Sequence, residues 1–284
     1  MHGSLKRKTI GYKRRSTSSS THTQSQRAAT VKKHLSIGLA LSILALAIFV
    51  WDWSQVNAAH SGPTPLDRAV IEWIHQRKSP WLTDLSLVLA GVGSTGMMIA
   101  ISIAGIIAGV RKPRLRDMAW TMPIASAGAG ILILTAKAYF HRVRPTLFTP
   151  IMHATGYSFP SGHSLFAMSV YGLLGYFWGT LTHNRWDRRL IHAATLFLIA
   201  IIGLSRIYLG VHYPTDVLAG WSAGLPWLVI CVVIREALDR TLHKPRHQDG
   251  GAGRRFGSSF ARNRAKSFGS MSSKSRSGKR RTPA

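Results

Sequence analysis

The chain has 284 residues, of which 46% are hydrophobic, and 37 Lys and Arg against 10 Asp and Glu give it a net charge of +27. Its single cysteine, Cys231, excludes an intramolecular disulfide. The positive charge is concentrated at the ends: residues 1–34 hold nine Lys or Arg and no acid, and residues 235–284 hold fourteen against three acids. Both ends are also rich in Ser, Gly or Thr, so we predict that residues 1–34 and 239–284 are disordered tails.

The basic tails also limit the class of partner. Next to an apolar span, such a segment is more typical of attraction to anionic lipid and of retention on the cytoplasmic side than of binding to nucleic acid. We therefore expect both tails to be cytoplasmic and to attract anionic membrane lipids. A membrane-tethered nucleic-acid binder is the less favoured alternative.

Between the tails, residues 35–238 form the predicted membrane domain. A hydrocarbon core about 30 Å thick needs roughly 20 apolar helical residues, and runs of this length are too long for strands. Six runs come near that length, and their connections are too short for a large soluble protein. We predict an all-α bundle of six transmembrane helices. The predicted spans are residues 35–53, 85–110, 118–136, 164–181, 190–204 and 217–234.

The first span has two alternative interpretations. A secretory signal would be cleaved near VNAAHS, but the 34-residue polar leader and the 19-residue apolar run both exceed the usual signal pattern. An organelle transit peptide would also be rich in Ser and Arg and free of acids. We favour an uncleaved membrane anchor.

A short helix is predicted between the first two spans, in PLDRAVIEWIHQ at residues 65–76. Its apolar side chains recur with helical spacing, and an amphipathic helix of this kind lies along the outer membrane interface. It either packs against the bundle or shapes the entry of lipid. The predicted apolar face consists of Leu66, Ala69, Val70, Trp73 and Ile74.

The short connections predict the orientation of the bundle. Residues 111–117 hold four Lys or Arg and residues 183–189 hold three. The positive-inside rule places both connections on the cytoplasmic side together with the tails. The other connections then face the periplasm or the exterior, in the inner (plasma) membrane of a bacterium.

Polar groups interrupt the apolar pattern at the outer ends of four predicted spans. KAYFHRVRP contains Lys137 and, seven residues later, Arg144; FPSGHS opens the fourth span; SRIYLGVHYPTD, residues 205–216, joins the fifth to the sixth. Each motif alone has an ordinary explanation, as a snorkelling cation, a capped turn or an interfacial histidine. Because all three fall in one layer, we interpret them as one phosphate site.

The cations and a helix start in this layer suit the binding of phosphate. Lys137, Arg144 and Arg206 supply positive charge, and guanidinium groups hold phosphate oxygens in a bidentate way. Ser161 stands at an N-cap position, so the backbone N–H groups from Gly162 onward can face an anion.

Two histidines supply reactive groups. His212 is the candidate nucleophile at phosphorus, and Asp216, four residues later, orients its ring and stabilises its positive form. His163 is the candidate acid, which protonates the leaving oxygen and later draws a proton from water.

The three motifs, K-x6-RP, PSGH and SR-x5-H-x3-D in this order, resemble the signature of the type 2 phosphatidic acid phosphatase (PAP2) family. The resemblance covers residues 137–216 and extends to residues 35–234 through the six-span layout, while the tails fall outside it. It implies a helical bundle, hydrolysis without a metal or cofactor, and a phosphohistidine intermediate. The resemblance implies that His212, His163 and Asp216 are catalytic and that Lys137, Arg144, Ser161, Gly162 and Arg206 bind phosphate.

These features predict a membrane lipid phosphatase that removes a terminal phosphate from a lipid phosphate or diphosphate at the outer leaflet. In a bacterium we favour undecaprenyl diphosphate over phosphatidate, phosphatidylglycerol phosphate and lipid A 1-phosphate. One alternative is phosphoryl transfer to a second lipid. A transporter is another, although transporters more often carry polar groups near the midplane. Vanadate-dependent haloperoxidases resemble the same constellation but are soluble.

Overall fold

The computed structural model describes the backbone of residues 18–242 and the side chains of residues 36–238. Residues 1–17 and 243–284, which belong to the two predicted tails, lie outside the described residues. The first helix begins at Ser18, so it takes in part of the segment for which we predicted disorder.

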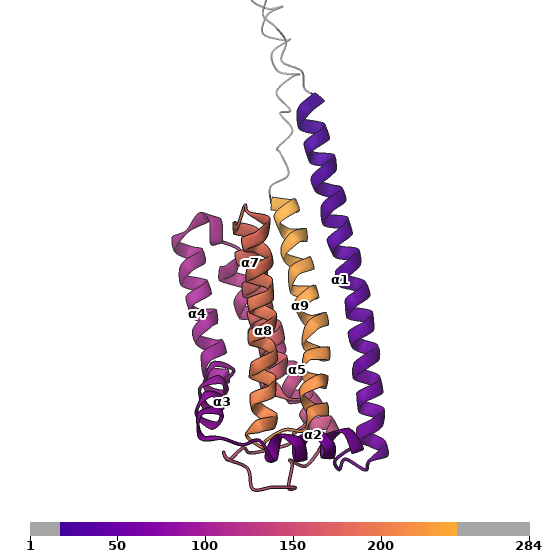
Figure 1. Cartoon of the computed structure of the whole chain (residues 1–284). Helices are drawn as coiled ribbons and strands as arrows, with labels where there is room; N and C mark the ends of the chain where they lie inside the picture. Colours follow the sequence, from indigo (N-terminus) through magenta and orange to yellow (C-terminus); the bar gives the residue numbers. More distant parts are fainter. Residues whose placement is uncertain (1–17, 243–284) are drawn as a thin grey trace, which may run out of the picture. The chain divides into compact units, whose positions relative to one another are not determined.

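The described part of the chain is built from helices, as predicted (Figure 1). The chain divides into two compact units, Met1–Ala237 and Leu238–Ala284, and the helical bundle and the site belong to the first. The elements are α1 (Ser18–Ala58), α2 (Pro65–His75), α3 (Pro80–Val92), α4 (Thr95–Arg111), the 3-10 turn η1 (Pro113–Leu115), α5 (Met118–Phe140), α6 (Gly162–Phe166), the π-helical turn η2 (Ala167–Tyr171), α7 (Gly172–Leu181), α8 (Arg185–Tyr208) and α9 (Pro214–Leu242).

Five segments of the described chain are long and apolar enough to cross a membrane, and the number rises to six if the bent pair α3 and α4 is one span. The elements α6, η2 and α7 together form one of the five, Gly162–Leu181. The prediction of an all-helical membrane protein is therefore confirmed for the described residues.

The second predicted span, residues 85–110, is wrong as a continuous helix. The helix is interrupted between α3 and α4, and the two helices differ in direction by 48°. Ser94 has extended backbone and caps α4, because its hydroxyl accepts a hydrogen bond from the N–H of Met97 at 3.3 Å. Average hydropathy does not detect such a cap inside an apolar run.

The predicted short helix is confirmed as α2, and part of its predicted apolar face packs on the bundle, because Val70 and Ile74 pack against a buried cluster that includes Ile207. Thr64 and Asp67 form a capping box at its start, and Asp67 and Ile71 are buried, whereas Leu66 and Trp73 are exposed. The fully buried residues, Asp67 and Ile71, each follow a residue of the predicted apolar face by one position, or roughly 100° around the helix. Counting apolar side chains did not predict the burial of Asp67, because a carboxylate is not part of an apolar pattern.

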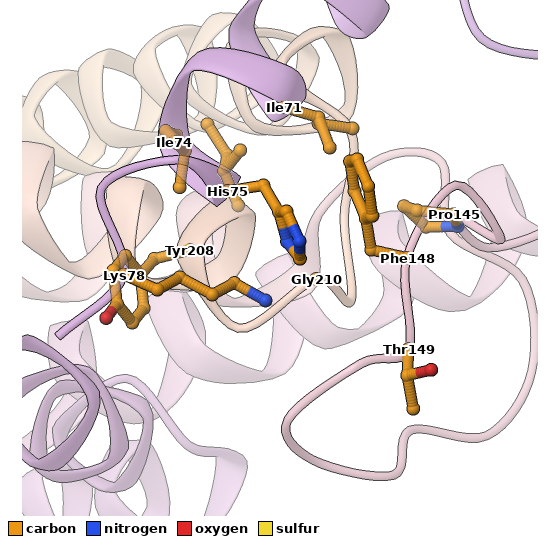
Figure 2. Close-up of a pocket in the computed structure, with 10 residues that line it drawn as sticks. Ile71, Ile74, His75, Lys78, Pro145, Phe148, Thr149, Tyr208 and Gly210 are labelled. Carbon is orange, nitrogen blue, oxygen red and sulfur yellow. The ribbon is translucent and has the colours of Figure 1, made fainter. Parts of the chain in front are cut away.

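The end of α2 packs on the long loop between α5 and α6. The ring of His75 stacks on that of Phe148, with centroids 3.7 Å apart and 6° between the planes. Figure 2 shows both rings, with Ile71 and Ile74 from α2 lining the same small pocket. The helix therefore braces the loop that follows Arg144.

Close packing brings α9 against the start of α6. A Cβ added to Gly220 would lie 2.6 Å from the Ser161 carbonyl oxygen, and one added to Gly224 would lie 2.8 Å from Cβ of Met168. Small residues one turn apart let membrane helices approach in this way. As a result the N–H of Ser161 donates to the carbonyl of Asp216 at 2.8 Å, and two of the three motifs meet.

The three motifs lie at the same end of the bundle as α2. Figure 1 shows the turn from α4 to α5 and the turn from α7 to α8 at the opposite end. The predicted connections 111–117 and 183–189 lie at these turns, although residues 185–189, with the three basic residues of the second, belong to the start of α8. The separation agrees with the predicted layer, while the side of the membrane on which each end lies stays a prediction.

Candidate active site

The predicted pair of His212 and Asp216 is formed. Gly210, with φ of +76°, turns the chain after α8, and His212 follows just before α9. Nδ1 of His212 lies 3.3 Å from Oδ2 of Asp216, and the backbone N–H of Tyr213 donates to the same oxygen at 2.9 Å. Both side chains are buried. The carboxylate therefore fixes the imidazole ring.

The environment of His212 favours its neutral form. Burial lowers its pKa to about 4, although the hydrogen bond and charge of Asp216 act in the opposite direction. With Nδ1–H donated to Asp216, Nε2 carries the free lone pair. Nη1 of Arg144 lies 3.5 Å from this Nε2. The unprotonated nitrogen of His212 thus faces a cation, where the oxygens of a phosphate would be attracted.

Arg144 is held by backbone carbonyls. Its guanidinium donates to the carbonyls of Gly156 at 3.0 Å, Thr155 at 2.8 Å and Val211 at 2.8 Å. Burial lowers the pKa of Arg144, and Asp216 only partly offsets this effect. These contacts orient the guanidinium and leave its positive charge unneutralised.

Lys137 and Arg206 lie within electrostatic range of each other and of Arg144. Nζ of Lys137 donates to the carbonyl of Tyr157 at 2.8 Å, and Nη1 of Arg206 lies 3.3 Å from Sδ of Met152. Within residues 36–238, none of the three cations pairs with a carboxylate, and Nε of Arg206 has no hydrogen-bond partner. Such a cluster suits an anion.

Ser161 occupies the predicted N-cap position before α6, where Gly162 is the first helical residue. Its hydroxyl makes no capping hydrogen bond, however. The Oγ atoms of Ser161 and Ser164 are buried, and neither has a partner among the described side chains and backbone. Because a buried hydroxyl without a partner is costly, these two groups are available to a ligand.

The side chain of His163 contacts α3 at the break in the second predicted span. In a continuous helix the N–H of Ser94 would bond the carbonyl of Ala90, but it bonds that of Gly91 at 3.1 Å instead. The freed Ala90 carbonyl accepts a hydrogen bond from Nε2 of His163 at 3.2 Å. Nδ1 of His163 is then the atom left for proton exchange with a substrate.

Two further contacts hold the segment between α3 and α4 against His163 and η2. A Cβ added to Gly93 would lie 3.0 Å from Cδ2 of His163, so glycine permits the close approach. The hydroxyl of Tyr171, in η2, donates to the carbonyl of Val92 at 2.7 Å. Arg206, His212 and Lys137 all lie within electrostatic range of His163, and the predicted site residues are therefore gathered in one region.

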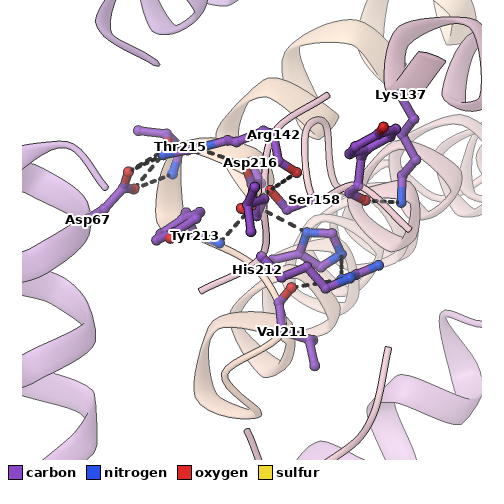
Figure 3. Close-up of polar contacts among 12 residues, drawn as sticks. Asp67, Lys137, Arg142, Ser158, Val211, His212, Tyr213, Thr215 and Asp216 are labelled. Atoms are coloured by element: carbon purple, nitrogen blue, oxygen red, sulfur yellow. Dashed lines mark hydrogen bonds and ion pairs between the residues drawn. The ribbon is translucent and has the colours of Figure 1, made fainter. Parts of the chain in front are cut away.

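A buried ion network supports the His–Asp pair, and the sequence analysis missed it (Figure 3). Arg142, wholly buried, donates to Oδ1 of Asp216 and to Oδ2 of Asp67, each at 2.7 Å. It also donates to Oγ1 of Thr215 at 2.7 Å and to the carbonyl of Gly62 at 2.8 Å. The chain of contacts thus runs from α2 through Arg142 to Asp216.

Asp67 ties α2 to α9 directly as well. Its Oδ1 accepts hydrogen bonds from the backbone N–H and the hydroxyl of Thr215, at 3.0 and 2.9 Å. The guanidinium of Arg142 also lies over the ring of Tyr213, 4.1 Å from its centroid. Two residues in the sequence could have indicated this network. Arg142 stands two residues before Arg144, and Asp67 is an acid in a helix that was expected to lie at the membrane interface.

Fold and comparison together define an integral membrane protein, with two histidines and three cations gathered in a candidate site at one end of its bundle. The family model described as the PAP2 superfamily matches residues 118–240. The chain is 30% identical to phosphatidylglycerophosphatase B of Bacillus subtilis over 60% of this chain and 81% of that protein. It is 25% identical to a putative undecaprenyl-diphosphatase of Escherichia coli over 58% of this chain and 80% of that protein.

The chain therefore belongs to the PAP2 superfamily, as its motifs predicted, and it is a phosphatase. A solved structure has the same fold, that of the transmembrane PAP2-type phosphatidylglycerolphosphate phosphatase from Bacillus subtilis. The TM-score is 0.61 at 24% identity, and the match covers 72% of this chain and 98% of that one.

Proposed function

We propose that this protein is a membrane lipid phosphatase that releases inorganic phosphate through a phosphohistidine on His212. The observation that carries the proposal is the geometry of this side chain: Nδ1 is held by Asp216 and Nε2 faces Arg144 at 3.5 Å. A neutral, oriented imidazole beside a cation is an activated nucleophile for phosphorus.

In the first step, Nε2 of His212 forms a bond to phosphorus while the bond from phosphorus to the leaving oxygen breaks. The proton on Nδ1 stays with the imidazole, whose positive charge Asp216 stabilises. Lys137, Arg144 and Arg206 bind the other phosphate oxygens. His163 gives a proton to the leaving oxygen, so the lipid departs as an alcohol or, from a diphosphate, as a monophosphate.

In the second step, water attacks the phosphohistidine. His163, now without its extra proton, takes a proton from the water as the new oxygen–phosphorus bond forms. The bond between Nε2 and phosphorus breaks, inorganic phosphate leaves, and His212 returns to its neutral form. In the transferase alternative, a lipid hydroxyl or phosphate takes the place of this water.

The substrate that we favour is a lipid diphosphate such as undecaprenyl diphosphate. A phosphomonoester carries a charge of about −1.5 to −2 at pH 7. Three cations without carboxylate partners exceed that charge and suit a diphosphate better. The names of the relatives also support a lipid phosphate. Phosphatidylglycerol phosphate, phosphatidate and lipid A 1-phosphate are the competing substrates.

We further propose six spans, with α3 and α4 as one bent span, both termini in the cytoplasm and the site at the outer face of the membrane. The basic connections at the opposite end of the bundle support this orientation. The site would then meet headgroups in the outer leaflet.

The test is phosphate release by the purified full chain in detergent, with EDTA, across the four candidate lipids. We expect release without any acceptor lipid, and a loss of about 10⁴-fold or more in His212→Ala, as for other nucleophile deletions. His183→Ala, which removes an exposed histidine at the opposite end, is the matched control. Full activity in His212→Ala would contradict the mechanism, and a requirement for an acceptor would show transfer.

A further inference from the structure

A groove of about 700 Å³ opens on the side of the bundle between α1, α5 and α9. Its volume is in the range of small-molecule binding sites. The lining is almost wholly apolar, from Leu46 on α1 to Ala223 and Trp227 on α9. On α5 it extends from Leu132 to Phe140, which is about 12 Å at the rise of an α-helix.

Trp227, which lines the groove, is fixed in place by two contacts with α5. Its indole Nε1 donates to the carbonyl of Ala125 at 2.9 Å. Gly128 makes room for the ring, because a Cβ there would lie 1.9 Å from it. The hydroxyl of Thr135, which also lines the groove, donates to the carbonyl of Ile131 at 2.9 Å within its own helix. The Trp227 indole and the Thr135 hydroxyl are therefore already hydrogen-bonded, and the groove offers mainly apolar surface.

One end of the groove borders the phosphate site. Pro160 lines the groove, and the next residue is Ser161, whose buried hydroxyl has no partner within the described part of the chain. Ala136 also lines it, and the next residue is Lys137. A phosphate held at the site would thus leave the lipid chain at the mouth of this groove.

Aromatic side chains pack together beside the groove at the same end. The ring of Phe140 lies 6.1 Å from that of Phe49 on α1 and 5.0 Å from that of Phe159, which precedes the PSGH motif. Trp53 packs on Phe140 at 4.2 Å. These rings join α1 to the site, so that α1 forms one wall of the groove.

We propose that this groove holds the hydrocarbon chain of the lipid whose phosphate occupies the site. The inference rests on the proposed function and deepens it by naming the surface that selects the chain. A second cavity, of about 340 Å³ between α4 and α5, does not border the phosphate motifs in the same way, since its lining includes only Phe166 of α6. The larger groove is favoured because its lining residues Ala136 and Pro160 directly precede Lys137 and Ser161 in the chain.

Variants that fill the groove test the proposal. Ala223→Phe fills it from α9, and Leu46→Trp fills it from α1, where the side chain is half exposed and a larger one is tolerated. For each, kcat/KM is measured with dipalmitoyl and with dihexanoyl phosphatidate in the same detergent. We expect the ratio of long-chain to short-chain kcat/KM to fall about tenfold, since pocket contacts discriminate on this scale.

The matched control is Ala127→Phe, which places the same bulk in the second cavity. It should leave the ratio within about twofold of the wild-type value. An unchanged ratio in both groove variants, or an equal fall in Ala127→Phe, would overturn the proposal while leaving the phosphatase function intact.

A second measurement does not need turnover. The full chain is photolabelled with a non-hydrolysable phosphonate analogue of phosphatidate that carries a diazirine in its chain. We expect labelled peptides from α5 and α9, with competition by the unlabelled phosphonate and not by diacylglycerol. Equal competition by diacylglycerol, or labelling confined to α4, would overturn the groove. Labelling as expected from a protein that hydrolyses no lipid phosphate would support the groove and refute the proposed function.

Discussion

Arg142 and Arg144 stand two residues apart in one loop, yet they belong to two different regions of the molecule. Arg142 lies in a support network with Asp67 and Asp216, in which each charge has an opposite charge beside it. Arg144 lies in the proposed phosphate region, and its guanidinium contacts only backbone carbonyls and Nε2 of His212.

The pKa of each guanidinium reflects this difference. Burial lowers the pKa of Arg142, but the charges of Asp216 and Asp67 outweigh burial and raise it. Burial also lowers the pKa of Arg144, and no carboxylate restores it fully. A charge that the protein neutralises holds the fold together, whereas one that it leaves unneutralised is available to a substrate. This distinction separates support from binding in this site.

Asp216 belongs to both regions, so its replacement should have the largest effect. Asp216→Asn keeps the shape but no longer fixes the tautomer of His212, and we expect kcat to fall about 10⁴-fold, as in other His–Asp pairs. The measurement is phosphate release beside thermal unfolding in detergent. Asp67→Asn is the matched control, because it breaks the other ion pair of Arg142 without touching His212. A similar fall in kcat in both variants would refute a direct role of Asp216.

Removal of Arg142 should act on stability. Arg142→Met leaves Asp67 and Asp216 buried without their counter-charge, and we expect a loss of about 3–5 kcal/mol in the free energy of unfolding. Thermal or denaturant unfolding measures it. Arg68→Met, at an exposed position on α2, should be close to wild type. Unchanged stability in Arg142→Met would mean that the network does not support the fold.

Arg144→Gln should show the opposite pattern. The fold keeps its ion pairs, so the melting temperature stays near the wild-type value, while kcat/KM falls about 10²–10³-fold through loss of charge stabilisation. Arg144→Lys should keep part of the activity that Arg144→Gln loses. Arg116→Gln, at the other end of the bundle, is the control and should keep the wild-type kcat/KM. If Arg144→Gln unfolds as readily as Arg142→Met, the separation into two regions is wrong.

The pH dependence of activity should show the smallest change. In the proposed mechanism only neutral His212 attacks phosphorus, and burial lowers its pKa to about 4, so kcat/KM should stay nearly constant on the acid side between pH 7 and about pH 5. An ordinary histidine, with a pKa of about 6.5, would lose most of its activity over that range. The measurement is a pH–rate profile, with recovery at pH 7 as the control for unfolding. An acid limb centred near 6.5 would contradict the buried, neutral state of His212.

The sequence predicted the helices and the site residues for identifiable reasons. Long apolar runs admit few structures in a membrane, and Lys137, Arg144, His163, His212 and Asp216 stand in motifs whose spacing is specific. The interactions of these residues with the rest of the protein could not be predicted from the sequence. Arg142 resembles any interfacial arginine until its two carboxylates, from α2 and α9, are seen to converge on it.

Two local features were missed for a related reason. Ser94 interrupts the second predicted span because its hydroxyl caps the start of α4, and the mean hydropathy of a long apolar run does not reveal such a single capping residue. The buried face of α2 depends on Asp67, whose partners lie 75 and 148 residues away in the chain. Both the support network and the orientation of α2 depend on contacts between residues far apart in the sequence. Such contacts cannot be predicted from the pattern of neighbouring residues.

The break between α3 and α4 has a consequence for mutagenesis of His163. In a bilayer, a main-chain carbonyl without a partner is costly, and His163 is the partner of the Ala90 carbonyl. His163→Ala would therefore delete the proposed proton donor and would also leave the Ala90 carbonyl of another helix without its hydrogen-bond partner. Its loss of activity combines two defects. A glutamine at this position would keep a donor for the carbonyl without an acid, and only such a replacement measures the contribution of proton transfer by itself.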